Sequence, residues 1–431
     1  MTMLLDDVPH TLLDEVPLTT RANGSRPSKP ASRKSGAISI ATDPCEDLLA
    51  AIEELAPAIT ARVTEIEAGR RIPPDLVEQL RSIGVFRMFA PRSHGGMELD
   101  LPSGLRIIET LSRIDGSIGW IAMIGGGSAI MAPLLSRDLY DEIYRDGPDV
   151  IFGGSTQPAG SAESIDGDWR VNGRWPFASG CQHADWLMGL CVMKKDGKPL
   201  PGPAEGVPTL RGCILPAGAW RIEDTWHVAG LKGTGSHHIV LEDVPVPADH
   251  FVDLLIGKPC VPGPLYGAVQ QFIPLLHTAF DLGVAAAALS DLVKLANSGW
   301  KQQRAVKSLR DSEIFQYEIG RVEADLRAAQ ALFQVQCASH WRHALAGTLK
   351  TEALLTEVTQ SAVWISAACN RVADACFALG GGTAIYDSSP LQRRMRDLHV
   401  GAQHAAVQAR NYLSAGALLM GHAANSPKLG A

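Results

Sequence analysis

The sequence predicts an α+β protein in which a central β region lies between two helical regions. Apolar residues recur every three or four positions over residues 49–66 and again over 352–379, which is the spacing of one face of an amphipathic helix. Residues 148–255 instead form short segments punctuated by glycine and proline, a pattern typical of strands joined by turns.

The first part of the chain divides into a leader and a helical domain. Residues 1–44 are rich in Ser, Pro, Arg and Lys without apolar periodicity, so we expect a disordered leader. We place an N-terminal helical domain at 45–147. Within it Pro73-Pro74 predicts the start of a second helix and Gly84 its end, because proline suits a first turn and glycine a helix terminus.

One stretch of this domain resembles a membrane span. Residues 116–136 carry no charge and are long enough to cross a bilayer, but three consecutive glycines and Pro133 interrupt them. We predict a buried helix pair in a soluble protein.

The central β domain is predicted at 148–255. The clearest strands are WRVNGRW at 169–175, GCILPAG at 212–218 and HHIVLEDVPV at 237–246. Five of the nine tryptophans fall in this region: Trp169, Trp175, Trp186, Trp220 and Trp226.

The remainder, residues 262–425, is predicted to form a helical bundle. Its two most regular helices cover 319–333 and 352–379, each with an apolar seam suited to packing against another helix.

Composition excludes several classes of function. With 39 Lys and Arg against 46 Asp and Glu, general nucleic-acid binding is not expected. Eight cysteines without C-x-x-C spacing favour free thiols in a reducing compartment, so we predict a cytoplasmic protein with no zinc site. Gly230–Gly235 looks like a dinucleotide loop, yet a strand follows it where a helix is required. His399 and His404 are five residues apart, a poor spacing for metal ligands, so no metal site is expected.

Several segments together resemble the acyl-CoA dehydrogenase superfamily over about residues 50–420. They are RRIPPDLVEQLRSIGVFRMFAPRSHGGMELD at 70–100, DGSIGW at 115–120, GGSTQPAGSAESIDGDWRVNGRWPFASGC at 153–181, WHVAGLKGTGSHHIVLEDVPVP at 226–247 and LGGGTAIYDSSPLQRRMRDLH at 379–399. The resemblance implies an N-terminal helical domain, a central β-barrel domain and a C-terminal four-helix bundle. It also implies a homotetramer that holds flavin between domains and a neighbouring subunit.

The resemblance also points to a branch of the superfamily. Its dehydrogenases need a carboxylate base to remove the α-proton of an acyl thioester. At one position that the family uses for this base the chain has Ala405, beside His404. At the other it has Leu276 and His277. Both bases are missing.

WPFASGC and RDLHVGAQH resemble instead the flavin-dependent monooxygenases of this fold. The implied function is the oxygenase component of a two-component system. It uses reduced FMN or FAD from a separate NAD(P)H:flavin reductase, and O₂, to hydroxylate a phenol, indole or polycycle by way of a flavin C4a-hydroperoxide. Alternatives left open are an acyl-CoA dehydrogenase with a displaced base and an N-oxygenase of an amine or amino sugar.

The site residues follow from this resemblance. Ser179 matches a hydroxyl beside the flavin ring, and His404 matches a histidine near the reacting centre that could exchange protons near neutral pH. Trp120 and Ser128 would line the substrate slot, with Trp120 also against the flavin. The other expected flavin contacts are Ser155, Thr156, Trp175, Thr234, Ser236, Arg304, Gly381 and Gly382.

Overall fold

The computed structural model describes residues 43–422, except 204–205, 255–256, 302 and 304. The leader expected at 1–44 therefore lies outside the described residues, apart from Asp43 and Pro44. These two begin the first helix, since the Asp43 carboxylate accepts a hydrogen bond from the backbone N–H of Cys45.

Helices form the first part of the described chain, as predicted. They are α1 (Pro44–Ala61), α2 (Val63–Gly69), α3 (Pro74–Ile83), α4 (Leu101–Ile114), α5 (Gly116–Ile121) and α6 (Arg137–Ile143). The predicted bounds of α3 are confirmed, because the helix begins at Pro74 and Gly84 ends it with a φ of 100°.

The stretch after α5 departs from the predicted helix pair. A π-helical turn, Ala122–Gly126, continues α5 and is followed by 3-10 turns at Gly127–Ile130 and Ala132–Leu134. Three glycines and a proline weaken regular α-helix here, so a single irregular helical path forms.

The central strands form one mixed sheet. They are β1 (Phe152–Ile165), β2 (Asp168–Ala178), β3 (Trp186–Lys195), β4 (Lys198–Pro199), β5 (Leu210–Pro216), β6 (Arg221–Glu223), β7 (His237–Val246) and β8 (Phe251–Val252). In the described chain the hydrogen-bonded path runs β6-β7-β2-β1-β3-β5-β8, with β1 and β3 parallel and the other pairs antiparallel.

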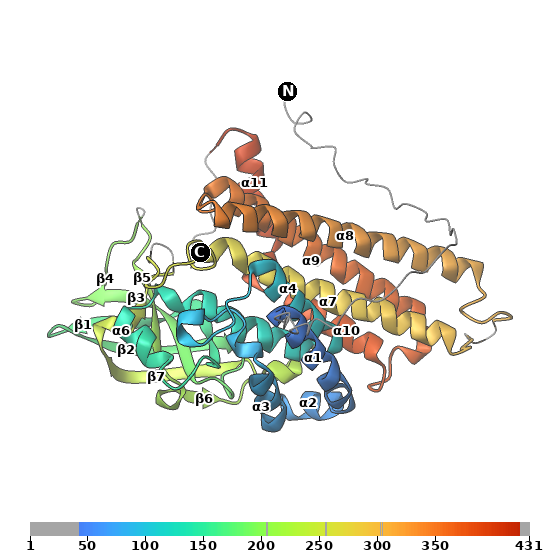
Figure 1. Ribbon diagram of the computed structural model, residues 1–431, viewed down its shortest axis with the longest axis horizontal. Coiled ribbons are helices and arrows are strands. Elements are labelled where there is room, and N and C mark those ends of the chain that lie inside the picture. The colour runs from blue at the N-terminus through green and yellow to red at the C-terminus, as the bar shows by residue number, and fades with distance from the viewer. Residues whose placement is uncertain (1–42, 204–205, 255–256, 302, 304, 423–431) are drawn as a thin grey trace, which may run out of the picture. The chain divides into compact units, whose positions relative to one another are not determined.

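The C-terminal helices pack as a bundle, which confirms the predicted fold class. They are α7 (Val269–Asn297), α8 (Glu313–Leu345), α9 (Glu352–Gly380), α10 (Pro390–Gly401) and α11 (Tyr412–Leu419). Helices α7, α8 and α9 run side by side, and α10 packs against α7 and α9 (Figure 1). Helix α4 of the N-terminal region also packs against α7, which ties the two helical regions together.

Three helical stretches are long and apolar enough to cross a membrane by length and composition. They are Gly116–Leu134, Val269–Asn297 and Glu352–Thr383, and 78%, 83% and 50% of their apolar windows are buried inside the protein. Most of this apolar surface therefore packs against the protein's own core.

Candidate active site

Three of the predicted site residues meet where the helical regions and the sheet join. Trp120 lies in the last turn of α5, Ser179 follows β2, and His404 follows α10. The Trp120 indole N–H donates to the Ser179 hydroxyl at 3.0 Å, and the Trp120 and His404 rings stand edge to face with centroids 5.8 Å apart. All three were predicted from sequence, and the structure brings them together.

Thr234 and Ser236 lie directly behind Ser179, almost fully buried at 1% and 3% exposure. The hydroxyl oxygens of Ser179 and Ser236 are 2.7 Å apart, and those of Ser236 and Thr234 are also 2.7 Å apart. Thr234 donates to the Leu231 carbonyl at 2.8 Å. These two residues were expected to contact the flavin itself, whereas in the structure they contact Ser179.

The hydrogen bonds between these hydroxyl groups can run in only one direction. A hydroxyl has one proton to donate. Thr234 gives its proton to the Leu231 carbonyl, so Ser236 must donate to Thr234 and Ser179 must donate to Ser236. Since Ser179 also accepts the Trp120 N–H, its oxygen keeps one lone pair and can only accept from a ligand. We call this chain, from Trp120 through Ser179, Ser236 and Thr234 to the Leu231 carbonyl, the hydroxyl relay.

The far end of the hydroxyl relay is fixed by α10. Leu231 adopts a left-handed conformation, with φ of 50°, and its N–H donates to the buried Asp397 carboxyl at 2.6 Å. Its carbonyl also accepts the Trp226 indole N–H at 3.0 Å. The loop that carries Thr234 and Ser236 is thus held by the C-terminal bundle.

His404 is neutral in its surroundings. Burial, and secondarily the neighbouring His277, lower the pKa of His404 to about 3. The His404 Nδ1 accepts the backbone N–H of Ala406 at 3.3 Å, so the ring proton is on Nε2. The ring is therefore poised as an Nε2–H donor at physiological pH. His404 was expected to exchange protons near neutral pH. That expectation is corrected, because its lowered pKa keeps the ring neutral there.

Trp175 belongs to the interior of the sheet. Its ring is 0% exposed, packs against Trp220 with centroids 5.3 Å apart, and donates its indole N–H to the Leu190 carbonyl at 2.7 Å. Glycines of three strands make room for it. The expectation that Trp175 lines the flavin slot is wrong, because no face of the ring is accessible.

The neighbouring aromatic Phe177 is exposed instead and was missed from sequence. Its φ is 63°, a rare conformation for a bulky residue, and its ring is 56% exposed. A register shift between β2 and β7 at Trp175/Ala178 turns it outward, towards Trp226 at 6.4 Å between ring centroids. The sequence offered one signal, the two aromatic residues Trp175 and Phe177 in a single strand. It did not show the bulge that turns these two side chains to opposite sides.

The remaining expected flavin contacts are scattered. Ser155 is buried and accepts the N–H of Gln157, while Thr156 beside it is exposed, at a bulge in β1. Gly381 ends α9 and Gly382 follows it on the surface. Arg304 lies outside the described residues.

Ser128 lines a small apolar cavity of about 40 Å³ between the irregular helical path and the sheet. Its other walls come from both sides: Met131, Ala132, Leu135, Phe152, Gly153, Met188, Ile214, Val252 and Leu254. Gly153, in the wall of this cavity, packs closely on the backbone of Ser179, because a methyl group there would lie 3.0 Å from the Ser179 carbonyl oxygen.

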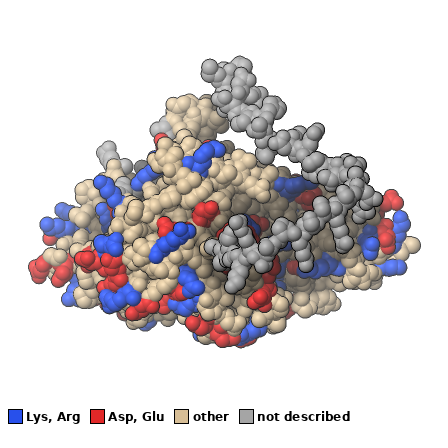
Figure 2. Space-filling model, viewed as in Figure 1, with Lys and Arg blue, Asp and Glu red and all other residues tan. Residues whose placement is uncertain are grey.

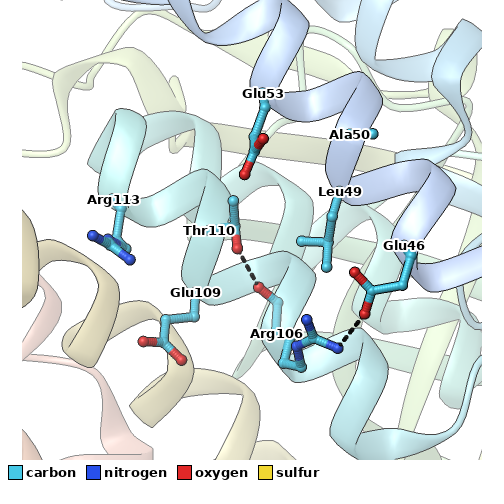
Figure 3. Close-up of a pocket in the computed structure, with 8 residues that line it drawn as sticks. All are labelled: Glu46, Leu49, Ala50, Glu53, Arg106, Glu109, Thr110 and Arg113. Atoms are coloured by element: carbon cyan, nitrogen blue, oxygen red, sulfur yellow. Dashed lines mark hydrogen bonds and ion pairs between the residues drawn. The ribbon is translucent and has the colours of Figure 1, made fainter. Parts of the chain in front are cut away.

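A larger cavity of about 390 Å³ lies elsewhere, between α1 and α4 (Figure 3). Its lining is charged, with Glu46 paired to Arg106 at 2.8 Å and with Glu53, Glu109 and Arg113 nearby. Acidic and basic side chains are likewise interspersed over the face shown in Figure 2. Across the described ranges, no three His, Cys, Asp or Glu side chains gather as metal ligands.

Comparison with known proteins identifies the class. Residues 45–138 match the acyl-CoA dehydrogenase N-terminal domain and residues 275–409 its C-terminal domain. The chain is 33% identical over 362 residues to indole-3-acetate monooxygenase of Pseudomonas putida, covering 84% of this chain and 90% of that protein. It is 28% identical over 363 residues to the oxygenase subunit HsaA of a flavin-dependent monooxygenase from Rhodococcus jostii, covering 82% and 93%.

A solved structure agrees. The crystal structure of 3-HSA hydroxylase from Rhodococcus sp. RHA1 superposes with a TM-score of 0.79 at 27% identity, covering 87% of this chain and 97% of that one. The chain therefore belongs to the acyl-CoA dehydrogenase superfamily. Within it, the chain is an oxidoreductase of the flavin-dependent monooxygenase family, as an oxygenase component.

Proposed function

We propose that this protein hydroxylates a small aromatic substrate with O₂ and reduced FMN or FAD, which a separate NAD(P)H:flavin reductase delivers. The observation that carries this proposal is the one-way hydroxyl relay ending in Ser179, beside Trp120 and a neutral His404. The names of the relatives, which include monooxygenases of indole-3-acetate and resorcinol, support an aromatic substrate.

The residues fit a reduced flavin. When bound, reduced flavin supplies the electrons that activate O₂ for transfer of one oxygen atom. Ser179 offers only an acceptor lone pair, which matches the N5–H that reduced flavin carries. The exposed ring of Phe177 provides an apolar surface near it. The buried rings of Trp120 and His277 stand beside His404 and shield that side of it from water, which would otherwise compete in the reaction.

Substrate binding is assigned to the side of Ser128 and His404. The cavity beside Ser128 is small, but Met131 and Met188 are unbranched and can change rotamer to admit a planar ring. The Nε2–H of His404 can donate a hydrogen bond to a substrate oxygen. We favour indole-type and phenolic substrates over CoA esters, because Ala405 and His277 occupy the positions expected for a dehydrogenase base.

Assembly as a homotetramer in the cytoplasm completes the proposal. Large apolar side chains remain exposed on α8 and α11, with Leu419 85% and Ile314 78% accessible. Burial of these side chains against a second copy would remove their apolar surface from water, and a second copy is the partner expected from the family resemblance. All eight cysteines are free thiols, in keeping with a reducing compartment.

The proposal is tested by supplying FMNH₂ or FADH₂ from a generic flavin reductase in air. The panel holds indole-3-acetate, indole, resorcinol and 4-hydroxyphenylacetate, with butyryl-CoA and an amino sugar as the alternative substrates. We expect an oxygenated product from at least one aromatic. Dehydrogenation of butyryl-CoA, or peroxide release that no aromatic alters, would contradict it.

A further inference from the structure

A buried pair, His277 and Asp281, stands directly behind His404. Both lie one turn apart on α7 and are 1% and 0% exposed. The His277 Nδ1 is 3.1 Å from an Asp281 carboxyl oxygen, and its Nε2 is 3.1 Å from the Gly401 carbonyl oxygen. The pair is deeply buried in a bundle whose other buried side chains are mostly apolar. Burial of two ionisable groups costs free energy, so their partners need to be identified.

The protons of the pair can be assigned from its partners. A carbonyl oxygen can only accept, so the His277 Nε2 carries a proton and donates it to Gly401. A second proton must then lie between Nδ1 and Asp281, since a bare imidazole lone pair would otherwise face a carboxylate. The pair as a whole is neutral, which is the condition under which two ionisable groups tolerate such burial.

The Gly401 carbonyl links this pair to His404. It accepts the backbone N–H of His404 at 3.0 Å as well as the His277 Nε2–H. Gly401 itself cannot be replaced easily, because a Cβ there would lie 2.8 Å from the Phe280 ring. The His277 and His404 rings also face each other, with centroids 5.2 Å apart and planes 31° from parallel.

From this arrangement we infer that His277 and Asp281 are positioning residues: they lock the turn Gly401–His404 and so aim the His404 Nε2–H at the reacting centre. His277 is itself almost fully buried and acts through His404. The inference rests on the proposed function for its catalytic consequence, but the locked turn is a property of the protein without any ligand.

The first test therefore uses no ligand. Hydrogen–deuterium exchange is measured by mass spectrometry on peptides covering residues 399–411 in the wild type, His277→Leu and His277→Gln. Leucine removes the donor to Gly401, so we expect exchange at least tenfold faster in these peptides. Glutamine keeps an N–H that can reach Gly401 and should restore most of the protection. Unchanged exchange in a folded His277→Leu protein would overturn the inference.

His340→Leu provides the matched control. His340 is also a fully buried helical histidine with two carbonyl neighbours, Gln336 and Leu354, but it lies on α8 away from His404. It should lower the melting temperature without changing exchange at 399–411. If His277→Leu fails to fold, His277→Met replaces it, because methionine also lacks the N–H donor to Gly401. The same increase in exchange is expected, and normal protection there would equally contradict the inference.

The second test asks whether the pair acts through His404. With the aromatic that the wild type oxygenates best, product per O₂ consumed should fall about tenfold in His277→Leu and recover in His277→Gln. In a His404→Ala background, His277→Leu should cause no further loss, because the effects are not additive when one residue acts through another. Full additivity would refute the coupling. If the wild type oxygenates no aromatic, the proposed function fails while the exchange test still decides the inference.

Discussion

At the scale of single residues, the active site depends on where protons lie. The hydroxyl relay leaves Ser179 with an acceptor lone pair. The Ala406 N–H, which donates to Nδ1 of His404, leaves the proton of that ring on Nε2. The sequence suggested a hydroxyl and a histidine for these roles, but it held no information on direction. The direction of the hydroxyl relay follows from the Leu231 carbonyl, which accepts the Thr234 proton, and the place of the His404 proton follows from the Ala406 N–H. Both contacts depend on the conformation of a local turn.

Ser236→Ala tests the relay. Without Ser236 the Ser179 proton loses its acceptor and becomes free to turn towards a ligand, so Ser179 no longer presents only a lone pair. We expect peroxide release per turnover to rise about tenfold, which corresponds to about 1.4 kcal/mol. Ser366→Ala is the control, because Ser366 is also buried and its hydroxyl has no partner among the described residues. Equal peroxide release by the two variants would contradict the role given to the hydroxyl relay.

The pH dependence of oxygenation tests the state of His404. Because the pKa of His404 is lowered to about 3, the ring stays neutral from acid to alkaline assay conditions. Between pH 6 and 8, we therefore expect the wild type and His404→Gln, which keeps an N–H donor, to show profiles of the same shape. A break near pH 6.5 that is present in the wild type and lost in His404→Gln would show instead a histidine titrating near its ordinary value.

At the scale of elements, β2 shows why the place of Trp175 could not be predicted from the sequence. Alternation along a strand would send residues 175 and 177 to the same side. The register shift against β7 reverses this, so Trp175 fills the core of the sheet and Phe177 faces outward. Helix starts and stops, and the strands at 168–178, 210–216 and 237–246, were predictable because local residues decide them; a bulge depends on the partner strand.

Trp175→Ala and Phe177→Ala should therefore fail in different ways. Removing the fully buried Trp175 should lower the free energy of unfolding by about 3–5 kcal/mol, as Trp220→Ala should also do in its neighbour. Phe177→Ala should leave stability within about 1 kcal/mol but weaken reduced-flavin binding about tenfold, measured under anaerobic conditions. Weakened flavin binding in a stable Trp175→Ala protein would contradict this division.

At the scale of the whole molecule, long-range contacts join the helical regions to the sheet loop that carries the relay. Asp397 on α10 accepts the Leu231 N–H, and Ser117 near the start of α5 accepts the Gly233 N–H at 3.1 Å. The order of helices and strands could be predicted from sequence. The meeting of Trp120, Ser179 and His404 could be expected only from the family resemblance, since 284 positions separate the first from the last.

Asp397→Asn tests this connection through stability. Burial, with the nearby Asp115, raises the pKa of Asp397 to about 7, whereas the unfolded chain should release this proton near pH 4. The native state thus binds the extra proton between about pH 4 and 7, and its stability falls as pH rises through that window. Asparagine still accepts from Leu231 but cannot ionise.

We therefore expect the melting temperature of Asp397→Asn, relative to the wild type, to increase between pH 4.5 and pH 8. Asp196→Asn, in the exposed turn between β3 and β4, serves as the control and should show a constant difference. A difference for Asp397→Asn that is constant or decreases with pH would contradict a protonated, buried Asp397.

The most direct test of the central claim is transfer of oxygen from ¹⁸O₂. The protein is mixed with FMNH₂ or FADH₂ prepared without oxygen, then with ¹⁸O₂ and indole-3-acetate or another aromatic of the panel, and the product is analysed by mass spectrometry. We expect one ¹⁸O atom in the aromatic product of the wild type and a large loss of labelled product in His404→Ala. Unlabelled product, or a wild type that converts no aromatic but dehydrogenates an acyl-CoA, would contradict it.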